Sequence, residues 1–337
     1  MGQGSSQDPP GDDKQSQDDD AVPSGAVAGP RLYTAKFGNH QWPIKVGQNH
    51  KRLVTANILR ETKEDIVEPL EITEDELLVV HTQEYLNSLK SSYNVALITE
   101  VAPVAIVPNF VLQRKLLSPF REQTGGTVLA GKLARDRGWS INIGGGFHHC
   151  SSSEGGGFCA YADITLCIKF MFNHLDNISK VLVLDLDAHQ GNGYERDLGM
   201  DSKVFIADVY NRWIYPNDRE AKRYIDKRIE LDLHTEDTVY LGVIKTLLPE
   251  VLNDFKPDMV IYNAGTDILK GDPLGLLDIT DEGVRDRDEL VFTEVRKNRG
   301  IPILMLTSGG YQRNNAEIIA NSIINLHSKG LITGPSE

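Results

Sequence analysis

The chain of 337 residues carries a formal net charge of −13, and hydrophobic and charged residues make up 40% and 25% of it. Such a composition is typical of a globular protein with a substantial core, and the length allows one large α/β domain. The negative charge argues against direct binding to nucleic acid. No apolar run approaches the roughly 20 residues of a membrane helix, and no apolar leader follows the N-terminus. The three cysteines form no CxxC pair, so we expect a nuclear or cytoplasmic protein that is not secreted.

Residues 1–30 differ in composition from the rest of the chain. They are rich in Gly, Ser, Pro, Gln and Asp and contain almost no large apolar side chain, so we predict a disordered acidic tail. The first residues, MGQGSS, match the pattern for N-myristoylation of Gly2. The alternative is a flexible start that matches by chance, and contact with a membrane is expected only if Gly2 carries the lipid. Residues 31–332 are predicted to form one domain, followed by a short tail at 333–337.

From residue 31 onward, short apolar runs rich in β-branched residues alternate with segments of helix length. The runs at 139–143, 181–186, 204–209, 259–262 and 303–306 are typical of buried parallel strands. Helices are predicted at 120–137, 160–175, 237–255 and 281–298 from their periodicity and their Gly and Pro boundaries. This alternation predicts a three-layer α/β/α domain with a mainly parallel central sheet.

Polar side chains follow four of the predicted strands, at the point where each strand ends. Ligands of open parallel sheets bind outside the carboxyl ends of the strands, so four separate segments bring Asp, His and Tyr to one edge. One such segment would be weak evidence, but four are difficult to explain by chance. The segments are GGGFHH at 144–149, DLDAHQGNG at 185–193, NAGTD at 263–267 and TSGGY at 307–311.

The step Asp187-Ala188-His189 has the spacing of a metal site. Residues two apart on an extended strand point to the same side, so the carboxylate and the imidazole can reach one ion. Asp267 supplies a third ligand, and three protein ligands with an open position are typical of catalytic zinc. An isolated Asp-x-His step is more often a capped loop, but the other strand ends favour the metal site.

A histidine pair and a tyrosine complete the predicted centre. His148 and His149 are adjacent and cannot easily bind the same ion, so we expect them to perform acid–base work on water at the metal. Asp185 and Asn192 flank the metal ligands and are candidates for fixing the histidine tautomers. Tyr311 follows two glycines, where its hydroxyl can reach a developing oxyanion. The alternative for Tyr311 is a surface position in a loop.

These motifs resemble those of the zinc-dependent histone deacetylases, and most closely those of the class IV branch. The resemblance covers about residues 70–332, and the His pair, Asp-x-Asp-x-His and Gly-Gly-Tyr in this order are highly specific as a set. It implies the arginase/deacetylase-like fold and hydrolysis of acyl groups, either acetyl or long-chain fatty acyl, from lysine side chains of histones or other proteins. A role in chromatin regulation and transcription repression, with corepressor partners, is implied as well.

The resemblance also implies a role for each candidate residue. His149 acts as general base and then as general acid, while His148, held by Asp185, supports it electrostatically. Tyr311 donates a hydrogen bond to the oxyanion, and zinc polarises the amide carbonyl. A structural potassium ion is implied behind the zinc, bound by Asp185 and Asp208.

Walls of a tunnel for the acyl-lysine side chain are implied in the same way. Gly157 and Phe158 form one wall, and Tyr215 forms the opposite wall, with Tyr210 as the alternative. Gly309 is assigned to substrate binding.

Two stretches depart from the family pattern. Gly38-x-His40-x-x-Pro43 is only a loose counterpart of the class IV loop near the tunnel entrance. Between Ser91 and Leu112 we find no counterpart of the rim aspartate with which class I enzymes clamp the substrate backbone. The sequence therefore defines the peptide substrate less well than the reaction centre.

Three other functions fit parts of the pattern. A manganese ureohydrolase of the arginase type needs an Asp two residues past the metal-binding histidine, and Gly191 stands there instead. An acyl-polyamine amidohydrolase shares the chemistry, and only substrate assays separate it from a lysine deacylase. A non-catalytic scaffold of a repressor complex would keep the fold, but every ligand and Tyr311 are present.

Overall fold

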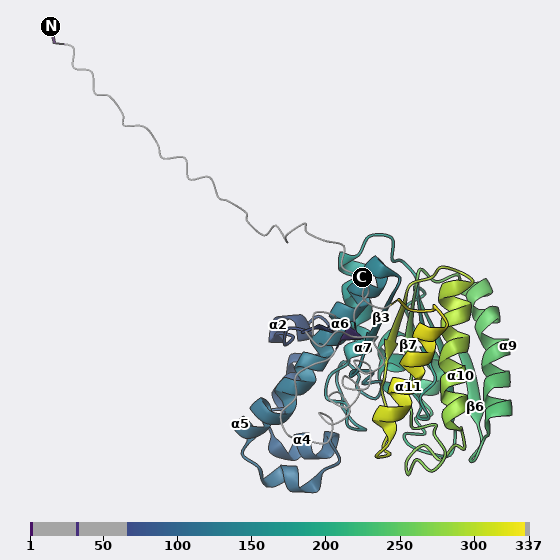
Figure 1. Ribbon diagram of the computed structural model, residues 1–337. Helices are drawn as coiled ribbons and strands as arrows, with labels where there is room; N and C mark the ends of the chain where they lie inside the picture. Colours follow the sequence, from purple (N-terminus) through teal and green to yellow (C-terminus); the bar gives the residue numbers. More distant parts are fainter. Residues whose placement is uncertain (3–31, 34–65, 334–337) are drawn as a thin grey trace.

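The computed structural model describes residues 1–2, 32–33 and 66–333. Within these residues the chain forms a parallel sheet with helices on both faces (Figure 1), which confirms the predicted three-layer α/β/α architecture. The acidic tail from residue 3 onward, the stretch from Gly38 to Pro43 and residues 334–337 lie outside the described residues. The predicted domain boundaries therefore stay predictions.

The sheet contains eight strands in the order β2-β1-β3-β8-β7-β4-β5-β6, and each pair of neighbours is parallel. The five predicted strands correspond to β3, β4, β5, β7 and β8, whereas β1, β2 and β6 were not predicted. The strand β6 is an edge strand with the sequence KRIEL, and its charged residues suit an edge that is only partly covered. The strands are β1 Leu32–Tyr33, β2 Ile66–Val67, β3 Trp139–Asn142, β4 Val181–Asp185, β5 Val204–Asn211, β6 Lys227–Leu231, β7 Met259–Asn263 and β8 Ile303–Leu306.

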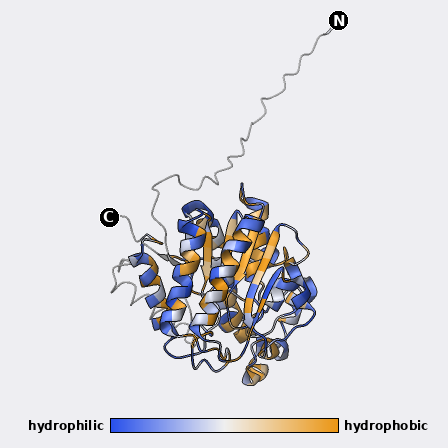
Figure 2. Ribbon diagram, turned by 90° about the vertical axis from the view of Figure 1, so that its right-hand side faces the viewer, coloured by the Kyte–Doolittle hydropathy of each residue, from blue (hydrophilic) through white to orange (hydrophobic). Residues whose placement is uncertain are grey.

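The central strands are apolar along their whole length because helices cover both faces of the sheet. Every residue of β3, β4, β7 and β8 is buried, as expected for a parallel sheet between two helical layers. Successive side chains point to opposite faces, so the neighbours Leu182 and Val183 pack in two different apolar clusters, one on each face of the sheet. Figure 2 shows the apolar strands of this sheet and the hydrophilic residues on the helices that cover it.

The long helices match the predicted ones, with two differences at their ends. The segment predicted as 160–175 becomes helical only at Asp163, whose side chain binds the preceding loop. The segment predicted as 281–298 widens into a π-turn after Phe292. No helix among the described residues is long and apolar enough to cross a bilayer. The main helices are α6 Ser118–Arg137, α7 Asp163–His174, α8 Asn192–Leu198, α9 Asp237–Phe255, α10 Asp281–Phe292 and α11 Asn315–Ser328.

A lobe of short elements lies beside the edge of the sheet where the predicted site residues gather (Figure 1). Its inner side chains form a third apolar cluster with Phe147 and Tyr161, and the backbone N–H of Phe158 donates to the carbonyl of Ile98 at 3.0 Å. The lobe is therefore attached to the loop that contains a predicted tunnel wall. Its elements are α2 Glu74–Leu77, α3 Gln83–Ser88, α4 Ser92–Ile98, η1 Ala102–Ile106, α5 Asn109–Leu112 and η2 Gln113–Leu117. Two short elements lie elsewhere, η3 Ala221–Tyr224 and η4 Thr293–Lys297.

Candidate active site

The four strands that precede the predicted site residues are neighbours in the sheet. Their order is β3, β8, β7, β4, so the loops that follow them meet at one edge although they are far apart in sequence. The loops contain, in that order, the histidine pair, Tyr311, Asp267, and the Asp187–His189 step. The parallel topology thus brings the sequence-predicted residues together at the carboxyl ends of the strands, where α/β proteins bind ligands.

Asp187, His189 and Asp267 form a buried cluster whose ligand atoms all lie within 4.8 Å of one another. Nδ1 of His189 lies 3.1 Å from Oδ1 of Asp187 and 3.0 Å from Oδ2 of Asp267. Two carboxylates and one imidazole form a donor set that zinc accepts in catalytic sites. This group fits a single divalent cation.

Backbone groups hold both carboxylates of the cluster in place. The N–H of Gly309 donates to Oδ2 of Asp187 at 3.0 Å, and the N–H of Ala188 donates to Oδ1 of Asp267 at 2.9 Å. A Cβ on Gly309 would lie 2.2 Å from Oδ2 of Asp267 and 2.6 Å from Oδ2 of Asp187. Only glycine allows the loop after β8 to approach the cluster this closely, and the predicted role of Gly309 in substrate binding stays a prediction.

The charges of the cluster also favour a cation. Burial and the neighbouring Asp187 raise the pKa of Asp267 to about 7. Burial would lower the pKa of His189, but the carboxylates of Asp187 and Asp267 raise it to about 10. Two fully buried carboxylates side by side therefore require positive charge, which a proton or a metal ion can supply.

The histidine pair has two different partners. Nδ1 of His148 lies 3.0 Å from Oδ2 of Asp185, and Nδ1 of His149 lies 2.8 Å from Oδ1 of Asn192. The rings of the pair are close, with centroids 4.1 Å apart. Each predicted partner is therefore next to the predicted histidine.

The environment separates the pKa values of the two histidines. Burial opposes the charge of His148, but the carboxylates of Asp187 and Asp185 raise its pKa to about 9. Burial and the nearby charge of His148 lower the pKa of His149 well below its ordinary value. These environments favour a proton on His148 over one on His149, so His149 is the member of the pair that is available to accept a proton.

Asp163 fixes the loop that presents the pair. Its buried carboxylate accepts the N–H groups of Gly146 and Phe147, each at 2.8 Å, and the hydroxyl of Thr127 at 2.7 Å. These bonds satisfy backbone donors that would otherwise be buried without partners. The periodicity of the sequence could not reveal this contact of Asp163.

A pocket of about 220 Å³ opens next to the cluster, and the residues predicted as walls of an acyl-lysine tunnel line it. Tyr215 packs edge-on against His149, with ring centroids 4.8 Å apart. A Cβ on Gly157 would lie 2.4 Å from Cδ2 of His149, so this wall requires glycine. Tyr210, the alternative to Tyr215, is buried elsewhere and donates to Glu230. The lining residues are Glu100, His149, Gly157, Phe158, His189, Tyr215, Pro273, Leu274 and Tyr311.

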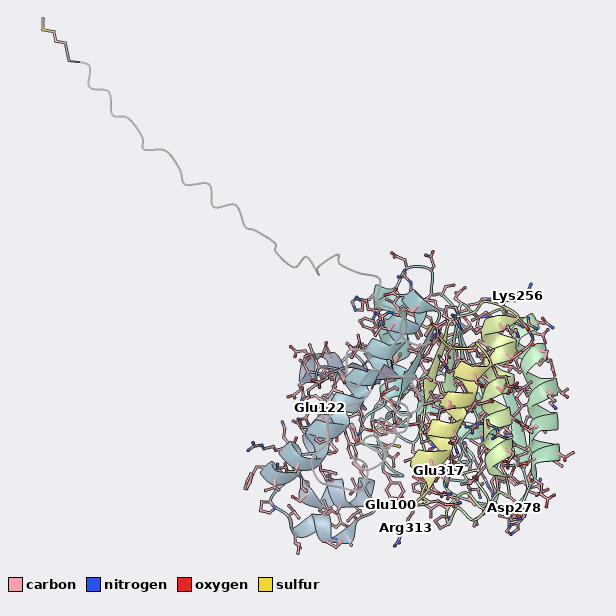
Figure 3. All side chains as sticks on the ribbon, viewed as in Figure 1. Glu100, Glu122, Lys256, Asp278, Arg313 and Glu317 are labelled. Atoms are coloured by element: carbon pink, nitrogen blue, oxygen red, sulfur yellow. The ribbon has the colours of Figure 1, made fainter. Side chains whose placement is uncertain are left out.

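The pocket includes residues that the sequence did not single out. Glu100 stands between α4 and η1 with a left-handed backbone (φ 53°), and it is the one charged residue between Ser91 and Leu112. Figure 3 shows Glu100 at the edge of the molecule opposite Lys256, which precedes β7. Asp272 was also missed: its carboxylate accepts the N–H groups of Tyr311 and Leu274 at 2.9 and 3.0 Å.

A larger pocket of about 380 Å³ lies apart from this centre, where Glu71, Leu86 and Arg121 are among its lining residues. Arg121 already pairs with Glu71 at 2.6 Å, and the pocket contains none of the candidate metal ligands or histidines. Size alone would favour this pocket, but the chemistry favours the smaller one.

Comparisons with known proteins agree with the geometry. The histone deacetylase domain family matches residues 42–326. "Histone deacetylase 2" of Arabidopsis thaliana is 55% identical over 296 residues, which are 88% of this chain and 74% of that protein. "Probable histone deacetylase 19" of Zea mays is 25% identical over 84% of this chain and 57% of its own length. "Acetoin utilization protein AcuC" of Staphylococcus aureus is 25% identical over 77% of this chain and 69% of its own length.

Proposed function

The chain belongs to the histone deacetylase family, and we propose that it is a zinc-dependent hydrolase that removes acyl groups from lysine side chains. The observation that supports this best is the buried cluster of Asp187, His189 and Asp267 beside a neutral histidine and a pocket. A zinc ion held by these side chains would polarise the amide carbonyl of the substrate and lower the pKa of water.

His149 is the proposed base. Because Oδ1 of Asn192 accepts from Nδ1 at 2.8 Å, the proton belongs on Nδ1 and Nε2 keeps its lone pair. Nε2 can then take the proton of the attacking water and later return it to the departing lysine amine. His148, held by Asp185 at 3.0 Å, supports His149 electrostatically.

Tyr311 is the proposed oxyanion donor. Burial and the carboxylates of Asp267 and Asp187 raise the pKa of its hydroxyl well above the ordinary value, so the hydroxyl stays protonated and can donate a hydrogen bond. Its ring lies 6.3 Å from that of His189 and 5.9 Å from that of Phe158, between the metal ligands and the proposed tunnel wall.

We also propose a potassium ion at the carboxylates of Asp185 and Asp208. Burial and the charge of Asp185 raise the pKa of Asp208 well above its usual range, and Oδ1 of Asp208 and Oε1 of Glu195 are buried without a hydrogen-bond partner among the described residues. A cation, or a proton shared by Asp208 and Glu195, would satisfy them. If the cation is correct, K⁺ raises the unfolding temperature of the wild type and not that of Asp208→Asn. An unfolding temperature independent of K⁺ would favour the proton.

The proposal for the substrate covers more possibilities than the proposal for the reaction. The class IV resemblance favours long-chain fatty acyl groups beside acetyl, on histones or other proteins, with corepressor partners and a nuclear or cytoplasmic location. Myristoylation of Gly2 also remains a proposal.

The position after Gln190 is Gly191, and the described residues contain one cluster of metal ligands, which supports one metal rather than the pair of an arginase-type enzyme. An acyl-polyamine amidohydrolase is the second candidate because it would use the same centre.

A panel of acetyl-, octanoyl- and myristoyl-lysine peptides and acetylated polyamines tests this function with the purified zinc-loaded protein. We expect release of at least one acyl group from lysine peptides and complete loss of the reaction with a zinc chelator. His149→Ala should bind zinc as the wild type does and lose the reaction. Hydrolysis of polyamines alone would favour the second candidate, and unchanged deacylation by His149→Ala would refute the proposed base.

A further inference from the structure

The partner of His149 is an amide, and an amide can face a histidine in two ways. Asn192 presents either its oxygen, which accepts a hydrogen bond, or its nitrogen, which donates two. Only the first orientation places the proton of His149 on Nδ1 and leaves Nε2 free as a base. The second orientation requires a lone pair on Nδ1 and moves the proton to Nε2. A carboxylate at position 192 would present an acceptor to His149 in either orientation. An asparagine does so only if another contact fixes the orientation of its amide.

Asp218 provides a contact that selects the first orientation. Nδ2 of Asn192 donates to Oδ2 of Asp218 at 3.3 Å, on the side away from His149. An ionised carboxylate only accepts hydrogen bonds, so it faces the NH₂ end of the amide and disfavours the oxygen. Two hydrogen bonds therefore connect His149 through Asn192 to Asp218.

Asp218 is itself fixed by an ion pair. Arg196 donates from Nε to Oδ2 at 3.0 Å and from Nη2 to Oδ1 at 2.7 Å, which is the paired geometry that orients a carboxylate most firmly. The N–H of Ala221 adds a bond to Oδ1 at 3.1 Å. Burial alone would raise the pKa of Asp218, but Arg196 and Ala221 lower it below its usual range, so the carboxylate stays ionised at neutral pH.

The backbone of Asp218 is attached to the metal loop as well. Its N–H donates to Oε1 of Gln190 at 3.0 Å, and its carbonyl accepts from Nε2 of Gln190 at 3.1 Å. Gln190 directly follows the proposed ligand His189. The carboxylate therefore keeps its position relative to the reaction centre although it belongs to a different loop.

We propose that Asp218, clamped by Arg196, is a positioning residue that holds the amide of Asn192 so that Nδ1 of His149 carries the proton. This inference rests on the proposed role of His149 as base. Asp218 is not one of the proposed metal ligands and does not line the pocket, so it acts through Asn192.

The tautomer of His149 is the most direct readout, and it requires no substrate. Nitrogen-15 NMR of the zinc-loaded protein distinguishes Nδ1–H from Nε2–H, with His149→Ala used to assign the signal. We expect Nδ1–H in the wild type and a substantial Nε2–H population in Asp218→Ala. The same pure Nδ1–H signal in Asp218→Ala would overturn the proposal, whether or not the protein proves to be a lysine deacylase.

Kinetics provide a second readout through a double-mutant cycle. Asp218→Ala should lower kcat at least about tenfold with little change in KM, since a catalytic histidine in the wrong tautomer can cost up to about 10⁴-fold. In the Asn192→Asp variant, the side chain at position 192 is a carboxylate, which presents an acceptor to Nδ1 of His149 in either orientation. Adding Asp218→Ala to this variant should therefore not lower kcat further. An equal loss in both backgrounds would overturn the proposal.

A matched control separates positioning from the loss of an ion pair. Glu294 of η4 and Arg299 form a comparable pair at 2.9 Å with side chains 18% and 25% exposed, and neither residue lines the pocket beside the proposed metal ligands. Glu294→Ala should leave both kcat and the tautomer of His149 unchanged. A loss equal to that of Asp218→Ala would show that any such ion pair matters and would contradict the specific role.

Discussion

His81 should make the protein sensitive to acid, although it lies outside the reaction centre. Its ring is 2% exposed. Nδ1 lies 3.2 Å from the carbonyl of Ser152, and Nε2 accepts the N–H of Ala162 at 3.1 Å. A neutral ring with its proton on Nδ1 makes both bonds, whereas a second proton on Nε2 would face the N–H of Ala162. Burial accordingly lowers the pKa of His81 from 6.5 to about 4.

The size of the effect follows from this shift. Between pH 6.5 and about 4 the unfolded chain binds a proton at His81 and the folded chain does not, so the folded state loses stability as the pH falls. At about 1.4 kcal/mol per pH unit, the loss amounts to about 3 kcal/mol across this window. Below about pH 4 both states bind the proton, and His81 contributes no further loss.

Urea unfolding of the wild type and of His81→Gln at several pH values measures this contribution. The glutamine variant should be less stable at pH 7, by about 1–3 kcal/mol for the altered hydrogen bonds, and should lose about 3 kcal/mol less than the wild type on acidification to pH 4. Acid protonates the other groups equally in both proteins, and replacement of the exposed His174 by Gln is the matched control. Parallel stability profiles for the wild type and His81→Gln would refute the reasoning.

Two further substitutions test the reaction centre. Tyr311→Phe removes the proposed oxyanion donor and should lower kcat by about 10²–10³-fold, while circular dichroism and zinc content stay unchanged; a rate near that of the wild type would exclude the role. Gly309→Ala places a Cβ 2.2 Å from a carboxylate oxygen of Asp267 and should weaken zinc binding in a chelator competition, whereas Gly242→Ala, whose Cβ meets nothing within 4 Å, should bind zinc as the wild type does. Equal affinities in the two alanine variants would contradict the close approach at Gly309.

The sequence predicted the architecture and the centre of the site for a simple physical reason. Buried parallel strands are apolar throughout, so polar residues such as Asp187 and Asp267 stand out where the strands end. The edge strand β6 escaped prediction because three of its five residues, Lys227, Arg228 and Glu230, are charged, so it is not an apolar run.

Contacts between distant loops were the part that the sequence could not reveal. Glu100 approaches the pocket because α4 and η1 are packed beside Phe158, and Asp218 approaches Asn192 because Gln190 and Arg196 bind it. Neither residue has a periodic signal or a motif spacing that points to a ligand. An expectation limited to aspartate also excludes Glu100, although both side chains end in a carboxylate.

Zinc titration of the metal-free protein, followed by the rate of lysine deacylation, tests the central claim most directly. If Asp187, His189 and Asp267 hold one zinc ion that serves the reaction, activity should rise linearly to one equivalent of zinc and then stay level. Asp267→Asn should shift this rise to much higher zinc concentrations. Activity that keeps rising to two equivalents, or that needs no zinc at all, would contradict the claim.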